Sequence, residues 1–191
     1  TGGDQRLGGT VGNLKLPNLG ANLLWDTTKF LSDGILVVVD PPYEWVATAA
    51  NSSFDDGTSW QDGQYTSLKE TSVTDAALAV NRTDATSEMQ LNSNASIRTL
   101  TVTSANGMTL NGGGTLSENP FIVDRSAINV KSGAGTVAIN TGLSLAKDAR
   151  ITVDNATAAG TLGGLVLGGH VAADRILIKA GSGTLALNSA V

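Results

Sequence analysis

Several residue types that carry chemistry in proteins are scarce or missing from this chain of 191 residues. It contains no cysteine, which excludes disulfides, thiolate metal sites and cysteine nucleophiles. It contains one histidine, His170, so no cluster of histidines can hold a metal. Only 15% of its residues are charged, against about 25% in an average globular chain. The net charge is −5, which disfavours nucleic-acid binding.

Aromatic residues and prolines are also few, and both are concentrated early in the chain. Aromatics make up 4% of the residues, and all of them except Phe121 lie within the first 65 positions. Apolar residues still make up 41% of the chain, so a folded core is expected, built from Leu, Ile, Val and Ala. The change in composition predicts an N-terminal arm over residues 1–45 and a second domain over residues 46–191. Pro41 and Pro42 would form a stiff connector between them.

Within the arm, the sequence predicts one short helix and one strand. Asn22 is placed to cap a helix over Leu23–Leu31, which Asp33 and Gly34 would end. Ile35–Val39 then reads as a β-branched strand that is apolar on both faces and needs burial on both. This run is far shorter than the roughly 20 residues that span a bilayer, so no membrane insertion is expected. The chain begins at Thr1 and shows no signal-peptide pattern.

The strongest signal in the sequence is an internal repeat. Residues 128–140 align without gaps on residues 176–188, with seven of the thirteen positions identical. Weaker copies begin at Leu100 and Ile151, so the copies start 23 to 28 residues apart. Each copy opens with a short alternating apolar segment, and Gly, Asn, Ser and Asp separate the segments.

This repeat predicts an all-β fold, a parallel β-solenoid (β-helix) of about four to five coils. In such a fold each strand pairs in parallel with the equivalent strand of the next coil. An antiparallel sandwich would also contain short strands, but it would not need repeats that resemble one another in register. We therefore expect Val130 and Ile178 to be buried at equivalent positions, with Lys131 and Lys179 pointing outward.

Two polar patterns follow the same period. Acidic residues precede successive repeats at Asp124, Asp148 and Asp174, each with an arginine one or two residues later. This pattern indicates a charged corner in which columns of Asp and Arg offset one another; the alternative is an acidic row that binds cations or cleaves polysaccharide. Asparagines recur at the ends of three copies, which predicts a structural ladder of stacked amides at Asn111, Asn140 and Asn188.

The arm and the glycine-rich turns together resemble a known family. The resemblance is carried by Leu14–Leu19, Leu24–Thr28 and Gly34–Val39, by Trp45 with Trp60–Gly63, and by Gly113–Leu116, Gly133–Val137 and Gly181–Leu185. These segments are similar to secreted bacterial surface proteins of the autotransporter-associated β-strand-repeat type, which also occur in planctomycete and verrucomicrobial-type bacteria. The resemblance implies an extracellular or cell-surface location and a passenger or scaffold role. It implies no catalytic residue.

Few residues are placed for catalysis. A Ser–His–carboxylate triad would have to use His170, and the sequence has no Gly-x-Ser-x-Gly elbow. Polysaccharide-processing enzymes often use solenoids, but the acids after residue 120 are sparse and no aromatic beyond Phe121 accompanies them. We therefore expect no enzyme activity, no catalytic residue and no bound cofactor or metal.

The densest acidic cluster consists of Asp55, Asp56 and Asp62. Its aromatic neighbours include Trp45, Trp60 and Tyr65. The leading interpretation is a polar loop whose rings close the first coil. A calcium site is one alternative, although the spacing does not match the EF-hand calcium loop. The other alternative is a glycan contact, because the same three aromatic rings can stack on a sugar.

These observations predict a non-catalytic extracellular structural protein, a subunit of a self-assembling fibre joined head to tail through its arm. The expected partner is a second copy of the chain, and an extracellular polysaccharide is the second candidate. The arm would either donate its strand to a neighbour or fold back on its own domain. The residues expected at the contact are Leu14, Leu16, Leu24, Trp25, Phe30, Leu31, Ile35, Val37 and Val39. The alternative functions are a carbohydrate-binding adhesive module and an inactive fragment of a polysaccharide-processing enzyme.

Overall fold

The computed structural model divides the chain into two compact units, Thr1–Pro41 and Pro42–Val191. It describes residues 16–17, 24–26, 30, 34–39, 42–61, 74–118, 126–145, 148–155, 164–173 and 176–188. The division falls between the two adjacent prolines rather than after residue 45. Tyr43–Trp45 belong to the second unit because they pair with strands of that unit.

The described part of the first unit contains a two-stranded antiparallel sheet. Strand β1 (Leu24–Asp26) pairs with β2 (Val37–Val39), with Trp25 opposite Val38. The expected helix over Leu23–Leu31 is therefore wrong for residues 24–26. Consecutive valines in β2 favour extended backbone, and this strand satisfies the backbone of β1. Phe30 is helical, and its carbonyl accepts a hydrogen bond from the Gly34 N–H at 3.0 Å.

The second unit is all-β, as the sequence predicts. A 3₁₀ turn, η2 (Gly57–Ser59), interrupts the strands near its start. The strands are β3 (Tyr43–Trp45), β4 (Ser52–Ser53), β5 (Trp60–Gln61), β6 (Thr74–Val80), β7 (Ser87–Gln90), β8 (Ala95–Val102), β9 (Met108–Asn111), β10 (Thr115–Glu118), β11 (Ser126–Val130), β12 (Val137–Ile139), β13 (Gly142–Leu145), β14 (Ala149–Val153), β15 (Gly164–Leu167), β16 (Val171–Ala173), β17 (Leu177–Ala180) and β18 (Thr184–Leu187).

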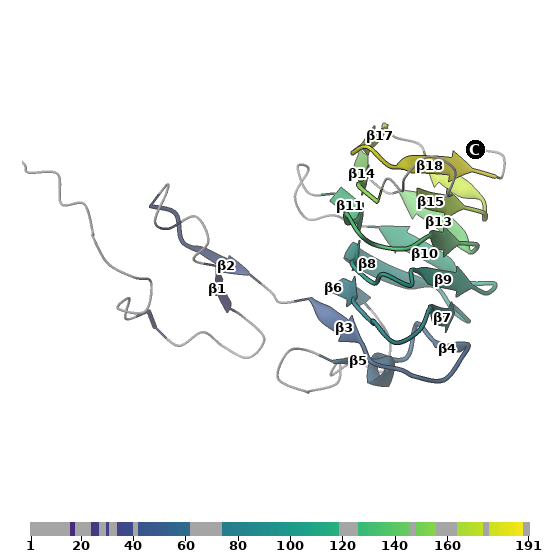
Figure 1. The fold of residues 1–191 in the computed structure, drawn as a ribbon, viewed down its shortest axis with the longest axis horizontal. Coiled ribbons are helices and arrows are strands. Elements are labelled where there is room, and N and C mark those ends of the chain that lie inside the picture. Colours follow the sequence, from purple (N-terminus) through teal and green to yellow (C-terminus); the bar gives the residue numbers. More distant parts are fainter. Residues whose placement is uncertain are drawn as a thin grey trace, which may run out of the picture. The chain divides into compact units, whose positions relative to one another are not determined.

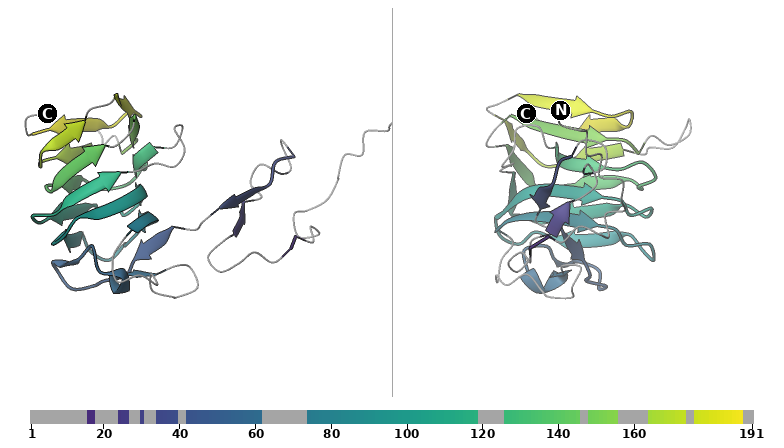
Figure 2. Two further views of the ribbon diagram at one scale, coloured as in Figure 1. Left: turned by 180° about the vertical axis from the view of Figure 1, so that it is seen from behind. Right: turned by 90° about the vertical axis from the view of Figure 1, so that its left-hand side faces the viewer.

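All of these strands except β5 form three columns in which each strand pairs in parallel with the next one along the column (Figures 1 and 2). Column 1 contains the first halves of β6 and β8, then β10, β13 and β16. Column 2 contains β3, β6, the second half of β8, β11, β14 and β17. Column 3 contains β4, β7, β9, β12, β15 and β18. One strand from each column makes a layer, and β16, β17 and β18 make the last layer.

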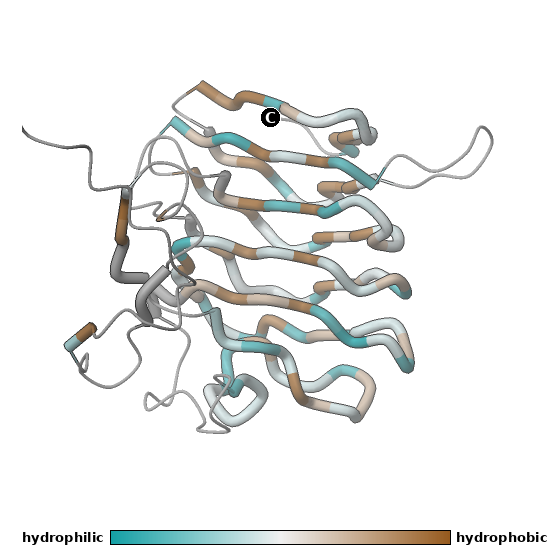
Figure 3. The backbone as a smooth tube through the Cα atoms, turned by 60° about the vertical axis from the view of Figure 1, so that its left-hand side comes forward, coloured by the Kyte–Doolittle hydropathy of each residue, from teal (hydrophilic) through white to brown (hydrophobic). Residues whose placement is uncertain are grey.

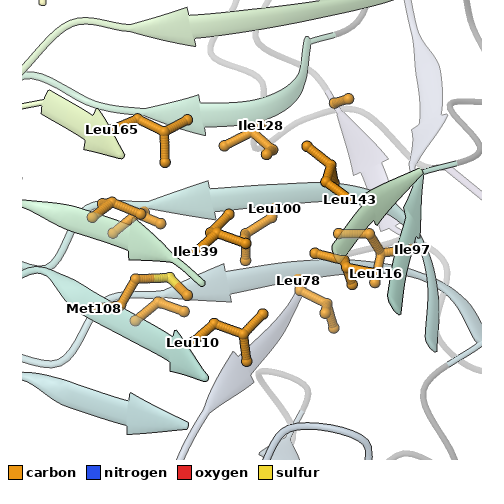
Figure 4. Packing of buried hydrophobic residues seen from close by; sticks show 14 of the residues in the cluster. Leu78, Ile97, Leu100, Met108, Leu110, Leu116, Ile128, Ile139, Leu143 and Leu165 are labelled. Atoms are coloured by element: carbon orange, nitrogen blue, oxygen red, sulfur yellow. The ribbon is translucent and has the colours of Figure 1, made fainter. Parts of the chain in front are cut away.

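Parallel pairing stacks apolar residues directly on one another in the core (Figure 4). In column 2, Leu78 pairs with Leu100, which pairs with Ile128, which pairs with Ile151. All four side chains are fully buried. Alternate residues of the same strands face away from the core, as the period of two predicts. Val130 is among the fully buried residues, as expected.

The predicted asparagine ladder is present as one amide pair. The Asn140 side-chain amide donates to Asn111 Oδ1 at 2.8 Å. In the next layer the equivalent position is Gly168, whose N–H donates to the Ile139 carbonyl at 2.8 Å. Gly168 has no side-chain amide, so the ladder stops there before Asn188. A Cβ at this position would approach Asn140 Oδ1 to 2.4 Å, which favours glycine. The expected Asp and Arg column includes Asp124 and Asp174, which lie outside the described residues, and it stays a prediction.

Val130→Asp tests whether the stacked core holds the second unit together. The substitution places a carboxylate at a fully buried position with no partner, so it should cost at least about 3 kcal/mol and unfold much of the unit. Circular dichroism during thermal unfolding measures the effect. Lys131→Asp, at the next and exposed residue, is the matched control and should melt close to the parent. Equal melting of all three proteins would show that the column is not the core.

Candidate functional site: the open end of the columns

In the part of the chain that the structure describes, each column ends in a strand of the last layer. Within the described residues, β16, β17 and β18 each pair on one side only, with β13, β14 and β15. This layer also carries three large exposed apolar side chains: Ile176 is 64% exposed, Ile178 45% and Leu187 43%. Figure 3 shows brown, apolar segments along this end of the columns. Unpaired edges with exposed apolar residues are where another strand can add.

The register of β17 places these isoleucines on the solvent side. The sequence repeat aligns Ile176 with Ile128, and Ile128 pairs with Ile151, so Ile176 should stack on Ile151. In the structure Lys179 pairs with Ile151 instead, a displacement of three residues. Because side chains alternate between the two faces of a strand, an odd displacement reverses every one of them. The expected burial of Ile178 is therefore wrong.

The same displacement gives the exposed Lys179 a register position that an apolar residue occupies in the layer below. Residues paired in parallel share a side of the sheet, so Lys179 lies on the side of the fully buried Ile151. Its ammonium group donates to the carbonyl of Gly181 at the exposed end of the stack. Ile178 lies on the other side of the sheet and pairs with the exposed Arg150. The open end thus has Lys179 above its apolar core and isoleucines on its outer surface.

The opposite end is closed by aromatic rings. Trp45 and Phe54 pack edge-on against Trp60, with ring centroids 5.0 and 5.1 Å apart. The Trp60 indole N–H donates to the Phe54 carbonyl at 2.8 Å. Trp45 is 2% exposed and Trp60 is 0% exposed, so neither ring offers a face to a sugar. The interpretation as a glycan contact therefore does not fit these two residues, and Tyr65 lies outside the described residues.

The acidic loop binds its own neighbours. Asp55 accepts hydrogen bonds from the Ser53 hydroxyl at 2.6 Å, the Ser93 N–H at 3.0 Å and the Ser93 hydroxyl. Burial acts to raise the pKa of Asp55, but these bonds outweigh it and the net pKa is lowered. Asp56 caps η2 by accepting from the Thr58 N–H at 2.8 Å. Asp62, the third acid of the predicted cluster, lies outside the described residues.

An arginine that sequence reasoning missed links the first two layers. The Arg82 guanidinium donates to the Ala47 carbonyl at 2.8 Å and forms a two-bond ion pair with Asp84. This hydrogen-bonded pair lowers the pKa of Asp84 to about 2. The spacing Arg-x-Asp in a turn was the available sequence signal, but such pairs are common on protein surfaces. Arg82 and Asp55 together fasten the closed end of the columns.

The remaining candidate residues form no catalytic or metal-binding cluster in the part of the chain that is described. His170 is exposed in a turn, and its carbonyl accepts from the Leu143 N–H at 2.8 Å. Among the described residues, no three acids, histidines or cysteines come close enough to hold a metal ion. The described residues also include no helix with the length and hydrophobicity needed to cross a bilayer.

The arm residues expected at a subunit contact fall into three groups. Leu14 and Leu31 lie outside the described residues. Leu16 and Phe30 are half-buried, and Ile35 is 46% exposed. The other four lie in the small sheet, Leu24 and Trp25 in β1 and Val37 and Val39 in β2.

Comparison of the chain with protein-family models, with curated proteins and with solved structures found no match. The resemblance to autotransporter-associated surface proteins therefore stays a prediction.

Asp55→Asn tests the structural role of the acidic loop. A group whose pKa is lowered on folding stabilises the fold above its unfolded pKa of about 3.9, and this stabilisation is lost as the pH falls through the folded pKa. The variant should lose about 1 kcal/mol of unfolding free energy at pH 7 and differ less from the parent near pH 3. Urea unfolding at both pH values measures this.

Asp56→Asn is the control for this experiment, because asparagine caps a helical turn about as well as aspartate. It should unfold like the parent at pH 7. An Asp55→Asn variant as stable as the parent at pH 7 would contradict the role assigned to Asp55.

Proposed function

We propose that residues 42–188 form a parallel β-solenoid and that the protein is an extracellular structural subunit. The solenoid is supported by the three columns, in which strands 20 to 37 positions apart in the sequence pair in parallel, such as β11 with β14 and β12 with β15. An antiparallel sandwich would pair neighbouring strands in opposite directions, whereas only β3 and β5 do so within the described second unit. One chain turn through columns 1, 2 and 3 makes one coil.

The observation that carries the functional proposal is the difference between the two ends of the columns. Buried rings and layer-linking hydrogen bonds close the first end. The last end presents unpaired strand edges and the exposed Ile176 and Ile178. A surface of this kind gains free energy when another apolar strand covers it.

We infer that the occupant is the arm of a second copy. The first layer of a neighbouring copy is a poorer occupant: the described β4 has an unpaired edge, but β5 covers the edge of β3 and the aromatic side chains are turned inward. The arm carries the apolar strand β2, three consecutive valines that pair with β1 on one edge only within the described residues. Ile35, two residues before β2, adds an exposed apolar side chain. An isolated two-stranded sheet is marginally stable, so the arm also gains from docking.

Such a contact joins two different surfaces of the same chain. A contact of this heterologous kind repeats from copy to copy and yields a filament unless it closes into a ring. Abundant Thr, Ser, Asn and Gly with few charges support an extracellular or cell-surface fibre, the location that the family resemblance also implies. The proposal includes no catalytic step.

Ile176→Ser combined with Ile178→Ser tests the open end as the contact. Both side chains are exposed in the single chain, so the variant should fold normally. Lost burial of about 1 kcal/mol for each isoleucine should weaken association by roughly thirty-fold. Sedimentation velocity over a range of protein concentrations measures the size of the species. Val46→Ser, at an exposed apolar residue of the first layer, is the control and should associate like the parent.

Val38→Asp in β2 then tests the arm as the occupant. A carboxylate in this strand should abolish the larger species while the second unit keeps its melting temperature. A variant that still associates would show that the arm is not the joint. A single chain that melts at lower temperature and never associates would show instead that the arm covers its own second unit.

A further inference from the structure

Strand β17 can pair with β14 in a second register that the sequence itself specifies. Column 3 follows the repeat alignment through the last layer, because Val137 pairs with Leu165, which pairs with Leu185. Column 2 departs from the alignment only at β17, where Lys179 occupies the place of Ile176 above Ile151. Sliding β17 by three residues would restore the alignment. Ile176 would then lie over Ile151, and Ile178 over Val153.

The connections on both sides of β17 have the lengths that the second register needs. The second register places Val171 in column 1 and Ile176 in column 2 of the last layer. These two residues are five positions apart in the sequence, as are Ala95 and Leu100 at the equivalent positions of an earlier layer. On the other side of β17, Ile176 in column 2 and Leu185 in column 3 are nine positions apart. Ile128 and Val137 have the same separation in the layer formed by the matching repeat, residues 128–140. Neither β16 nor β18 would have to move.

In the observed register, only the connection before β17 has a length that also occurs in an earlier layer. Val171 and Lys179 are eight residues apart, like Leu143 and Ile151 in the layer below. Lys179 and Leu185 are six residues apart, fewer than the eight between Leu100 and Met108. The observed register also has two hydrogen bonds that the slide would break: Ala149 N–H donates to the Ile176 carbonyl, and Ile176 N–H donates to the side-chain oxygen Oδ1 of Asp148.

Covering the end changes which register is favoured. While the end is open, Lys179 above the core keeps its ammonium group hydrated, and an inward-pointing charge on an edge strand discourages further strand addition. Once a strand docks on the last layer, the same ammonium group would be enclosed, and an enclosed unpaired charge is costly. The slide would move Lys179 to the outer surface. It would turn Ile176 and Ile178 toward the core side, where the docked strand would contact them.

We propose that β17 is a register switch that guards the open end of the single chain and slides by three residues when a second copy docks. This inference rests on the proposed function, since docking of a copy is what drives the slide. A ligand can shift such an equilibrium only by its difference in affinity for the two states. Here that difference comes from exchanging the inward-facing pair Leu177 and Lys179 for the pair Ile176 and Ile178 at the contact.

Engineered disulfides can lock each register, because the chain has no cysteine of its own. Thr152 pairs with Ala180 in the observed register and would pair with Leu177 in the second. Paired residues on adjacent strands lie about 4.8 Å apart, within disulfide range, whereas a displacement of three residues adds roughly 10 Å along the strand. Thr152→Cys with Ala180→Cys therefore locks the guarded register, and Thr152→Cys with Leu177→Cys locks the docking register.

The expected result is opposite behaviour of the two locked proteins. The oxidised T152C/A180C variant should lose self-association, as measured by sedimentation velocity, and regain it on reduction. The oxidised T152C/L177C variant should associate at lower concentration than the parent. Ala138→Cys with Val166→Cys, at two positions that pair in column 3 in both registers, is the control and should associate equally when oxidised or reduced.

Two other outcomes separate the failure of this inference from that of the proposed function. An oxidised T152C/A180C variant that associates like its reduced form would overturn the switch and leave the proposed assembly intact. A parent protein that stays a single chain at every concentration would overturn the proposed assembly, and the switch with it.

Discussion

Register in the parallel columns is the constraint on which the rest of this structure depends. A residue in one strand shares its side of the sheet with its partner in the strand below, so each column position is either inside or outside throughout. Leu78, Leu100, Ile128 and Ile151 are buried together because of this. Asn111 and Asn140 meet outside the core for the same reason. The sequence repeats because equivalent positions along a column share the same environment, inside or outside the core.

A stack of layers also has two ends, where this constraint is relaxed. An interior strand has a partner on each side, and its inward residues are fully buried. In the last layer the inward-facing Leu177 and Leu185 are only partly buried against the core. The apolar burial that holds a strand in register is therefore smallest there. The first end compensates with large rings, of which Phe54 and Trp60 have no exposed surface.

Predictions from the sequence were correct where several layers repeat the same residue pattern. They failed where the structure depends on one segment that has no counterpart in other layers. The all-β class, the burial of Val130 and the Asn111–Asn140 pair follow from residues that recur at a fixed period. Leu24–Asp26 carry no such repeat. A helix was predicted there from a capping residue and a stop signal, but these residues pair with the valines of β2 instead.

The sequence also reports residue type without reporting which end of the stack a residue occupies. Trp45 and Trp60 could equally have been an exposed sugar platform or a buried cap, and only the packing of the first layer distinguishes the two. Ile178 matches Val130 by type, yet it stands at an end where an adjacent layer does not enforce the matching register.

The two ends differ finally in how firmly side chains hold them. Near the closed end, Arg82 reaches the Ala47 carbonyl and Asp55 reaches Ser93, so side-chain hydrogen bonds tie the first layer to the second. At the open end, one side-chain link between described residues reaches the layer below, in which Asp148 accepts from the N–H of Ile176, and Lys179 donates within its own turn. Specific side-chain links fix a register more firmly than backbone pairing, which is nearly the same after a slide. The end where apolar surface is exposed is thus also the end held by fewer side-chain links among the described residues, and the proposed switch would place conformational change and association at the same site.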